Sequence, residues 1–303
     1  LDRQSFLGAD SDSKLQRATI GFVGLGGGGS HEIQQASHLG IGGFVVIDPD
    51  HITATNTNRL VGGTLADVEA ATTKVAIAER LIRGLQEHPR VISGCNTWHN
   101  MTHDLKRCDI ILGAVDSFKE REQLERFARR HLIPYIDIGM DVHDLGANKY
   151  LIGGQVVLSM PGKPCLRCYG MITDEKLALE ASKYGAAGSL PQVVWSNGVL
   201  ASTAVGLAVQ LLTPWFKEPP QSVYLDYDGN RGTLTPNDRM GQLRNKVCPH
   251  HPPEETGDAL FDVREFNRVR ADLTSKKMNS LSKSAPRNWF QAVMGELAKL
   301  FRR

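Results

Sequence analysis

The chain has 303 residues, of which 41% are hydrophobic and 22% are charged, so it can bury a sizeable core as an ordinary globular protein. Its formal net charge of +2 excludes a strong overall attraction to nucleic acids or membranes, and we expect neither as a partner. No apolar run approaches the ~20 residues that span a bilayer, and no signal segment opens the chain, which favours the cytoplasm.

The first half of the chain alternates strands with helices. We predict strands at 19–24, 44–47, 109–114 and 135–138, and helices at 30–39, 74–84 and 119–131. The step of roughly 24 residues from Gly24 to Asp48 fits a right-handed βαβ unit. The alternation predicts an α/β fold with a Rossmann-like, doubly wound and mostly parallel sheet.

The pattern changes after residue 149. A polar stretch at 170–191 precedes a long apolar helix at 193–212, which we expect to be buried, and two late strands at 222–227 and 232–234, which we expect to be antiparallel. Residues 252–282 are rich in Glu, Asp, Ser and Lys and resemble a linker. Residues 283–303 predict an amphipathic C-terminal helix.

A glycine-rich segment joins the first strand to the first helix. Its glycines let backbone N–H groups approach a phosphate at a helix N-terminus, and the candidate nucleotide-binding positions are Gly24, Gly26, Gly27 and Gly29. The same loop suits ATP, a nicotinamide cofactor or no ligand, so it does not identify the nucleotide. Asp48, at the end of the second strand, can bind ribose in either nucleotide class.

Polar and basic residues follow the second strand, and these favour a triphosphate over a nicotinamide cofactor: Asp50, Asn56, Asn58, Arg59 and Lys74. Turn formation by the asparagines and a solvated surface for the two basic residues are the alternatives. Asp116 follows the strand at 109–114, where open α/β sheets place ligands, although it is also a candidate helix N-cap.

A CxxC pair and a CxxH pair lie about 80 residues apart and have the spacing of zinc ligands. We expect a structural Zn²⁺ that stabilises the crossover region, with His250 as the alternative fourth ligand and buried free cysteines as the alternative to a metal. The expected ligands are Cys165, Cys168, Cys248 and His251. Four protein ligands leave no open position for catalysis.

Six motifs occur in one order: RQ at 3–4, GLGGGGS at 24–30, DPD at 48–50, NTNR at 56–59, Lys74 and AVDSFKER at 114–121. With these motifs, residues 1–251 resemble the ubiquitin-activating-enzyme superfamily, whose bacterial members include ThiF-type and MoeB-type adenylyltransferases. The resemblance implies that Asp48 binds the ribose of ATP and that Asp116 holds Mg²⁺. It assigns the triphosphate to Asn56, Arg59 and Lys74. It also implies that Arg3 completes the site of a partner subunit, in a homodimer or a paired pseudo-symmetric assembly.

The function implied by this resemblance is ATP-dependent adenylation of the C-terminal carboxylate, expected to be a glycine, of a small ubiquitin-like or sulfur-carrier protein. A downstream conjugating protein is then a further partner. Adenylation of a short peptide or small-molecule carboxylate is the alternative within the family, and the low net charge disfavours the branch that modifies tRNA. Outside it, the alternatives are an NAD-dependent oxidoreductase and a non-catalytic scaffold.

One family feature is missing. Many such enzymes carry a cysteine that forms a thioester a few residues before an Ala-Gly pair, and matching Ala187-Gly188 to that pair places Tyr184 at the expected cysteine. A thioester at this loop is therefore in doubt. We favour transfer of the acyl-adenylate to a partner's nucleophile over an oxyester on Ser182 or Ser189.

Overall fold

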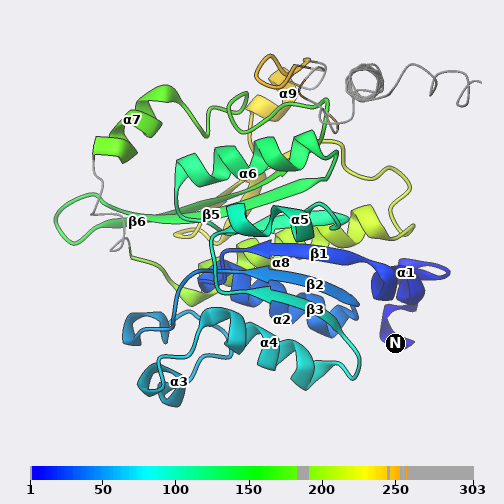
Figure 1. The fold of residues 1–303 in the computed structure, drawn as a ribbon. Coiled ribbons are helices and arrows are strands. Elements are labelled where there is room, and N and C mark those ends of the chain that lie inside the picture. The colour runs from blue at the N-terminus through cyan, green and yellow to red at the C-terminus, as the bar shows by residue number, and fades with distance from the viewer. Residues whose placement is uncertain (1, 183–190, 244–245, 253–254, 256, 258–303) are drawn as a thin grey trace, which may run out of the picture. The chain divides into compact units, whose positions relative to one another are not determined.

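The computed structural model describes residues 2–182, 191–243, 246–252, 255 and 257, which form an α/β fold around one large sheet (Figure 1). The strands are β1 (Thr19–Val23), β2 (Gly43–Ile47), β3 (Arg90–Gly94), β4 (Ile110–Gly113), β5 (Tyr135–Asp144), β6 (Tyr150–Ser159), β7 (Val223–Asp228) and β8 (Thr233–Pro236). The α-helices are α1 (Ser11–Arg17), α2 (Gly27–Leu39), α3 (Leu65–Glu69), α4 (Lys74–Leu85), α5 (Thr102–Leu105), α6 (Phe118–Arg130), α7 (Asp174–Ser182), α8 (Val194–Leu212) and α9 (Arg239–Leu243). The 3₁₀ helices are η1 (Asp2–Leu7), η2 (Ala54–Asn56) and η3 (Trp98–Met101).

The strands lie in the order β3-β2-β1-β4-β5-β6-β7-β8. Pairs from β3 to β5 are parallel, and pairs from β5 to β8 are antiparallel. The order of the parallel half is that of a Rossmann fold, whose order reverses between β1 and β4. The predicted Rossmann-like sheet with late antiparallel strands is therefore confirmed, and its ligand crevice is expected where β1 and β4 end.

Buried side chains alternate between the two faces of the sheet. On one face, Phe22 and Phe44 pack with α2, α4 and α8, and on the other, Ile111 and Tyr135 pack with α5 and α6. Figure 1 shows α2 and α4 on the opposite side of the sheet from α6. Because helices cover both faces, the inner parallel strands β1, β2 and β4 are buried almost throughout, which explains their continuous apolar runs.

Most of the elements expected from the sequence are present. The four early strands are β1, β2, β4 and β5, the three early helices are α2, α4 and α6, and the late strands are β7 and β8. Strand β3 was not expected, because its sequence RVISG lies at the edge of the sheet and keeps Arg90, Ile92 and Ser93 exposed. A partly solvated edge strand lacks the apolar run that identifies a buried one.

Helix α8 is a core helix of unusual composition. Its length and apolar residues are enough to cross a bilayer, contrary to our expectation that no run would approach that length, and half of the apolar window is buried within the fold. It packs against α2 and β5. The linker-like segment 252–282 and the C-terminal helix at 283–303 lie almost entirely outside the described residues and stay predictions.

The turn from β1 into α2 depends on glycines at two positions, Gly24 and Gly29. Gly24 has a φ of 87°, and its N–H donates to the Ile47 carbonyl over 3.0 Å. A Cβ at Gly29 would lie 1.9 Å from the Gly24 carbonyl oxygen, whereas a Cβ at Gly26 would meet no atom within 4 Å. The structure therefore requires a glycine at position 29, while Gly26 borders open space.

We predict that Gly29→Ala lowers the free energy of unfolding by about 3 kcal/mol or more, because the added methyl overlaps the Gly24 backbone. The matched control Gly26→Ala should cost less than about 1 kcal/mol, since Gly26 is the N-cap of α2 and its surroundings are open. Urea unfolding followed by circular dichroism measures both. Equal stabilities of the two variants would contradict this account of the turn.

Candidate nucleotide-binding and metal sites

The candidate nucleotide-binding residues lie mainly on loops at one edge of the sheet. The glycine loop follows β1, Asp48 and Asp50 follow β2, and Asp116 follows β4. Strands β2, β1 and β4 are parallel neighbours, so their carboxyl ends meet at this edge. The fold therefore brings together motifs that are up to about ninety residues apart in the sequence.

Asp48 holds the glycine loop in place. Its Oδ2 accepts a hydrogen bond from the Leu25 N–H over 2.6 Å, and its Oδ1 accepts one from the Asp50 N–H over 2.8 Å. Burial raises the pKa of Asp48, while the nearby Lys74 and these two N–H groups act to lower it. Each carboxylate oxygen has a second lone pair, so the carboxylate can also accept from ribose hydroxyls.

Lys74 is the first residue of α4 and is nearly buried beside two carboxylates. Its Nζ lies 2.7 Å from Asp50 Oδ2 and 3.4 Å from Asp48 Oδ1. The lysine is therefore held at this edge of the sheet by ion pairs. A phosphate that binds Lys74 must compete with Asp50, whose side chain is 63% exposed and has room to move away.

The NTNR motif forms a compact turn. Asn56 Oδ1 accepts hydrogen bonds from the N–H and the Oγ1 of Thr53, each over 3.0 Å, and so closes a capping box around η2. This is the turn role that the sequence offered as the alternative for Asn56. The Arg59 guanidinium donates to the Thr55 carbonyl over 2.6 Å and to Asn58 Oδ1 over 3.1 Å, which anchors it beside the glycine loop.

Asp116 is exposed in front of α6 and is not the cap of that helix. The N-cap is Ser117, whose Oγ accepts from the Glu120 N–H over 3.3 Å. Asp116 Oδ1 lies 3.5 Å from Gln192 Nε2. Burial raises the pKa of Glu120, and the negative charges of Asp116, Glu180 and Asp48 raise it further. The carboxylates of Asp116, Glu180 and Asp48 therefore lie close enough to Glu120 to act on its charge, and the nearby His99 opposes their effect.

Glu180, which the sequence analysis did not identify, binds the start of α6 from helix α7. Its Oε1 accepts from the Phe118 N–H over 2.8 Å, and its Oε2 accepts from the Lys119 N–H over 3.1 Å and the Ser117 hydroxyl over 3.2 Å. These are free N–H groups at the positive end of a helix. No local pattern predicts a contact between residues some sixty positions apart.

A buried ion pair stabilises the loop that carries Asp116. Arg121 Nε donates to the Val115 carbonyl over 3.0 Å, and Arg121 Nη1 donates to Asp137 Oδ2 over 2.8 Å. The Tyr135 hydroxyl donates to Asp137 Oδ1 over 2.8 Å. Burial raises the pKa of Asp137, and the guanidinium of Arg121 opposes that rise. Arg121 thus fixes the backbone immediately before Asp116.

Arg3 is exposed on η1, far from the glycine loop of its own chain. Chain segments η1 and α1 precede β1, whereas the glycine loop follows it, so the two lie at opposite ends of that strand (Figure 1). The ends of α8 show the same separation. Asn197 near its start adjoins Gly27, and Pro214 just after its end adjoins Gly8. A helix of this length spans about 28 Å, so the structure does not bring Arg3 to its own nucleotide loop.

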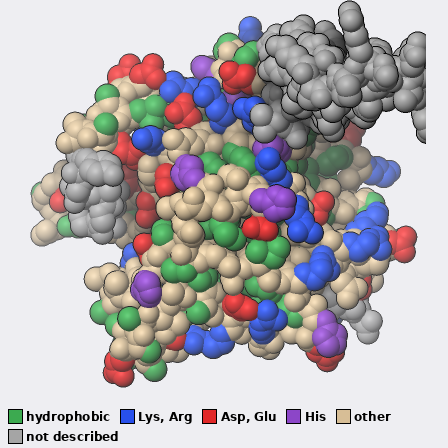
Figure 2. Space-filling model, in the orientation of Figure 1, with side chains coloured by type: hydrophobic (Ala, Val, Ile, Leu, Met, Phe, Trp, Pro, Cys, Tyr) green, Lys and Arg blue, Asp and Glu red, His purple; other side chains and the backbone are tan. Residues whose placement is uncertain are grey.

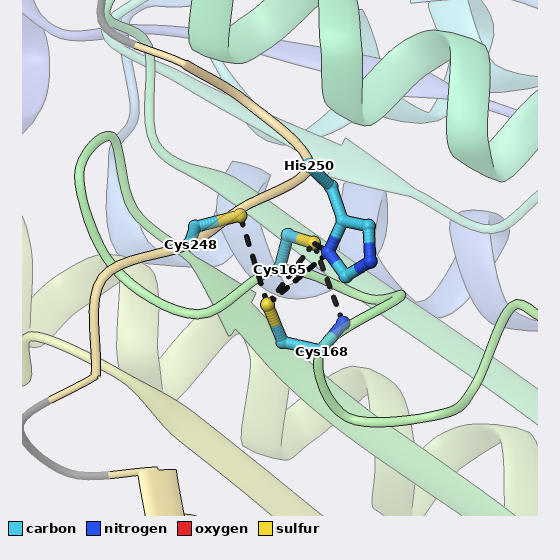
Figure 3. A group of neighbouring side chains, drawn as sticks. All are labelled: Cys165, Cys168, Cys248 and His250. Atoms are coloured by element: carbon cyan, nitrogen blue, oxygen red, sulfur yellow. Dashed lines mark hydrogen bonds between the residues drawn. The ribbon is translucent and has the colours of Figure 1, made fainter.

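Three cysteines and a histidine converge between the loop after β6 and the segment after α9 (Figure 3). The Sγ of Cys168 lies 3.6 Å from the Sγ of both Cys165 and Cys248. His250 Nδ1 lies 3.5 Å from Cys165 Sγ and 3.4 Å from Cys168 Sγ. Ligands around a tetrahedral zinc are about 3.6–3.8 Å apart, so this donor set fits that ion.

His250, and not His251, completes this four-residue cluster. His251 points to a different partner, with its Nε2 3.7 Å from Glu125 Oε2, although it also lies near Cys165. The sequence offered both histidines, and the CxxH spacing favoured His251. The backbone turn after Cys248 reverses that choice and brings the Nδ1 atom of His250 to the thiols.

The other candidate nucleophiles lie apart from this cluster. Cys108 is buried, and burial raises the pKa of its thiol to about 12. Cys95 is exposed, with its Sγ 3.5 Å from the Pro49 carbonyl oxygen. The Ser182 hydroxyl donates to the Leu179 carbonyl at the end of α7. Tyr184 and Ser189 lie outside the described residues.

The visible surface carries both signs of charge. Figure 2 shows Lys and Arg side chains in several small groups that alternate with acidic, neutral and hydrophobic side chains. No single basic field covers this face, in keeping with the net charge of +2. This distribution differs from the continuous basic surface typical of proteins that bind a nucleic-acid backbone.

Comparisons with known proteins agree with this fold. The sulfur carrier protein adenylyltransferase of Thermus thermophilus is 26% identical over 273 residues, which are 87% of this chain and 93% of that protein. The tRNA threonylcarbamoyladenosine dehydratase of Haemophilus influenzae is 28% identical over 131 residues, which are 43% of this chain and half of that protein. A crystal structure of Escherichia coli MccB with ATP has a TM-score of 0.59 and 23% identity, covering 76% of this chain and 67% of that one.

These proteins have different reactions, so similarity to them does not define the substrate of this chain. The match to the family itself runs over residues 1–250 and includes the glycine loop, Asp116 and all four residues of the Cys/His cluster. The chain belongs to the ThiF family.

Proposed function

We propose that this chain binds Mg-ATP at the glycine loop and adenylates the C-terminal carboxylate, that of a glycine, of a small ubiquitin-like or sulfur-carrier protein. The observation that carries the proposal is the set of charged residues around the glycine loop, which borders open space at Gly26. Arg59 lies beside Gly27, Lys74 pairs with the Asp48 that binds the Leu25 N–H, and Asp116 directly follows the Val115 next to Gly24. A nicotinamide enzyme would not need this combination. The similarity to a sulfur carrier protein adenylyltransferase over almost the whole chain supports the choice of substrate.

In this reaction a carboxylate oxygen of the carrier attacks the α-phosphorus of ATP. A new O–P bond forms, the bond to the β-phosphate oxygen breaks, and pyrophosphate leaves. Arg59 and Lys74 would stabilise the negative charge on the leaving group, and the N–H groups of the glycine loop would bind the phosphates. Lys74 is ion-paired with Asp50, so a phosphate of ATP that binds Lys74 would replace the Asp50 carboxylate.

Asp116 is the proposed magnesium ligand, because it is exposed and adds to the negative potential at Glu120. Mg²⁺ would offset the charge of the triphosphate and of these carboxylates. Arg121 and Glu180 position the Asp116 loop, through the Val115 carbonyl and the start of α6. The position of Asp116 therefore depends on both α6, which carries Arg121, and α7, which carries Glu180.

The acyl-adenylate is the proposed end product on this chain, and a partner protein supplies the next nucleophile. Two cysteines among the described residues lie outside the Cys/His cluster. Cys108 is buried, and Cys95 is exposed and lies next to Pro49, after β2. A carrier system then needs a conjugating or sulfur-donating protein downstream. A short peptide is the alternative carboxylate, supported by the fold shared with MccB, whose solved complexes include one with N-formylated MccA.

We predict ATP–pyrophosphate exchange in the presence of Mg²⁺ and a β-grasp carrier protein that ends in glycine. Asp116→Ala should lower the exchange rate by about 100-fold or more, because the triphosphate loses its metal ligand. Glu87→Ala removes the same charge from an exposed loop and should change nothing. Radiolabelled pyrophosphate incorporated into ATP is the readout.

Undiminished exchange in Asp116→Ala would overturn the assignment of this aspartate. If exchange requires a free short peptide and not the carrier, the substrate is a peptide and not a carrier protein. Tight binding of NADH without binding of ATP, measured by thermal shift, would support the oxidoreductase instead.

We also propose that the cluster of Cys165, Cys168, Cys248 and His250 holds one structural Zn²⁺. Neighbouring donor atoms lie 3.4, 3.5 or 3.6 Å apart where a distance joins them, all four lie within 4.8 Å of one another, and the protein supplies all of them. The buried Glu125 accepts from the Leu166 N–H over 3.0 Å and so fixes the loop between the first two cysteines. The metal would tie this loop to the segment after α9.

We expect one zinc per chain in the purified protein, measured by atomic emission. His250→Ala should lose most of the zinc and lower the melting temperature by several degrees, because one of four ligands is removed. His251→Ala is the matched control and should retain the zinc, since it removes the contact with Glu125 and leaves the four proposed ligands in place. Zinc loss in His251→Ala with retention in His250→Ala would reverse the ligand assignment.

A homodimer would place Arg3 at the nucleotide site of its partner. Helix α8 has no charged residue, and besides Val194 its exposed positions recur at helical spacing: Trp195, Val199, Ser202 and Gly206. An apolar stripe of this kind suits an interface. If α8 packs antiparallel to the same helix of a second copy, the end next to η1 meets the partner's end next to the glycine loop.

Mixing two inactive variants tests this arrangement. Arg3→Ala and Asp116→Ala each lack one component of the site, yet a mixed dimer would have one intact site built from both chains. Co-refolding at equal amounts should restore about a quarter of the wild-type exchange rate, because half of the dimers are mixed and have one working site. No recovery above the separate variants would show that Arg3 does not act across an interface.

A further inference from the structure

The start of α8 lies directly against the glycine loop. A Cβ at Gly27 would lie 2.5 Å from Asn197 Nδ2 and 3.3 Å from Arg59 Cδ. The side chains of Asn197 and Arg59, which come from different parts of the chain, therefore meet at the first residue of α2. Because a helix N-terminus here is the expected phosphate-binding element, Asn197 is next to the proposed triphosphate.

The Asn197 amide has a fixed orientation and hydrogen-bonding capacity to spare. Its side chain is nearly buried, and its Nδ2 donates to the Val193 carbonyl over 3.0 Å. An amide nitrogen carries two hydrogens, so the second one can donate to a ligand. The bond to Val193 holds the group in place before any ligand arrives, which reduces the entropy lost on binding.

Other donors collect at the same end of α8. The first N–H groups of a helix have no acceptor within it, and the N-cap residue Val193 has no side chain that could accept from them. The Ser196 hydroxyl, in the same turn, is fully buried and has no hydrogen-bond partner among the described residues. Buried polar groups in native proteins are nearly always hydrogen-bonded, so this unpaired hydroxyl suggests a missing acceptor.

We propose that Asn197, at the start of α8, is an additional contact for the triphosphate and acts with Arg59 on the β- and γ-phosphates. This inference rests on the proposed binding of ATP and adds to it a phosphate contact from α8, next to that of Arg59. The N-termini of helices α2 and α8 would then both contact the β- and γ-phosphates of the nucleotide. Helix α8 belongs to the core, so this contact is rigid.

The experiment compares the affinities of the full-length chain for ATP and AMP by isothermal titration calorimetry. Asn197→Ala should weaken ATP binding by roughly ten-fold or more, because a hydrogen bond to a charged group is lost, and should change AMP binding less than about two-fold. Asn197→Asp has almost the same shape and should weaken ATP binding further, since its carboxylate repels the phosphates. Glu87→Ala, on the exposed loop before β3, is the control.

The outcomes separate this inference from the proposed function. If the wild-type chain does not bind ATP, the proposed function itself fails. If the wild type binds ATP and both Asn197 variants bind it equally well, the phosphate contact is wrong. Equal losses for ATP and AMP would make Asn197 a packing residue for α2 and would also overturn the inference. Melting temperatures of the variants show whether each one folds.

Discussion

The contact between Gly29 and the carbonyl group of Gly24 determines much of the rest of the site. It brings the start of α2 against the end of β1 and directs the first N–H groups of the helix to the edge of the sheet. Asp48 can reach the Leu25 N–H only because the loop is this tight, and Asn197 can approach only because Gly27 has no side chain. Glycines at 24, 27 and 29 thus serve the packing of the protein, while Gly26 alone borders open space.

The charges around this loop are paired before any ligand is present. Lys74 contacts Asp50 and Asp48, and Arg59 is hydrogen-bonded to its own turn. Such pairing avoids burying an isolated charge, which would be costly. It also means that an anion exchanges partners with Asp50 when it binds. A structural and a functional role for Lys74 are therefore compatible.

The fold could be predicted from the sequence because buried parallel strands and amphipathic helices leave strong periodic patterns. Strand β3 escaped prediction, since an edge strand with exposed Arg90 and Ser93 lacks that pattern. The candidate site could be predicted where a motif is local, as in the glycine loop. Glu180 and Asn197 could not be found, because each contacts a segment distant in sequence, and the choice between His250 and His251 depends on a backbone turn that residue spacing does not reveal.

The cluster of three cysteines and His250 has a consequence for the order of folding. Its donors come from two segments separated by about eighty residues, so the cluster closes a long loop that includes α7, α8 and strands β7 and β8. During synthesis the first two cysteines emerge well before the last two donors. If the cluster holds the proposed zinc, the metal can link the loop after β6 to the segment after α9 only once residue 250 is present. A chain truncated before residue 248 would lose that link even though strands β1 to β8 remain.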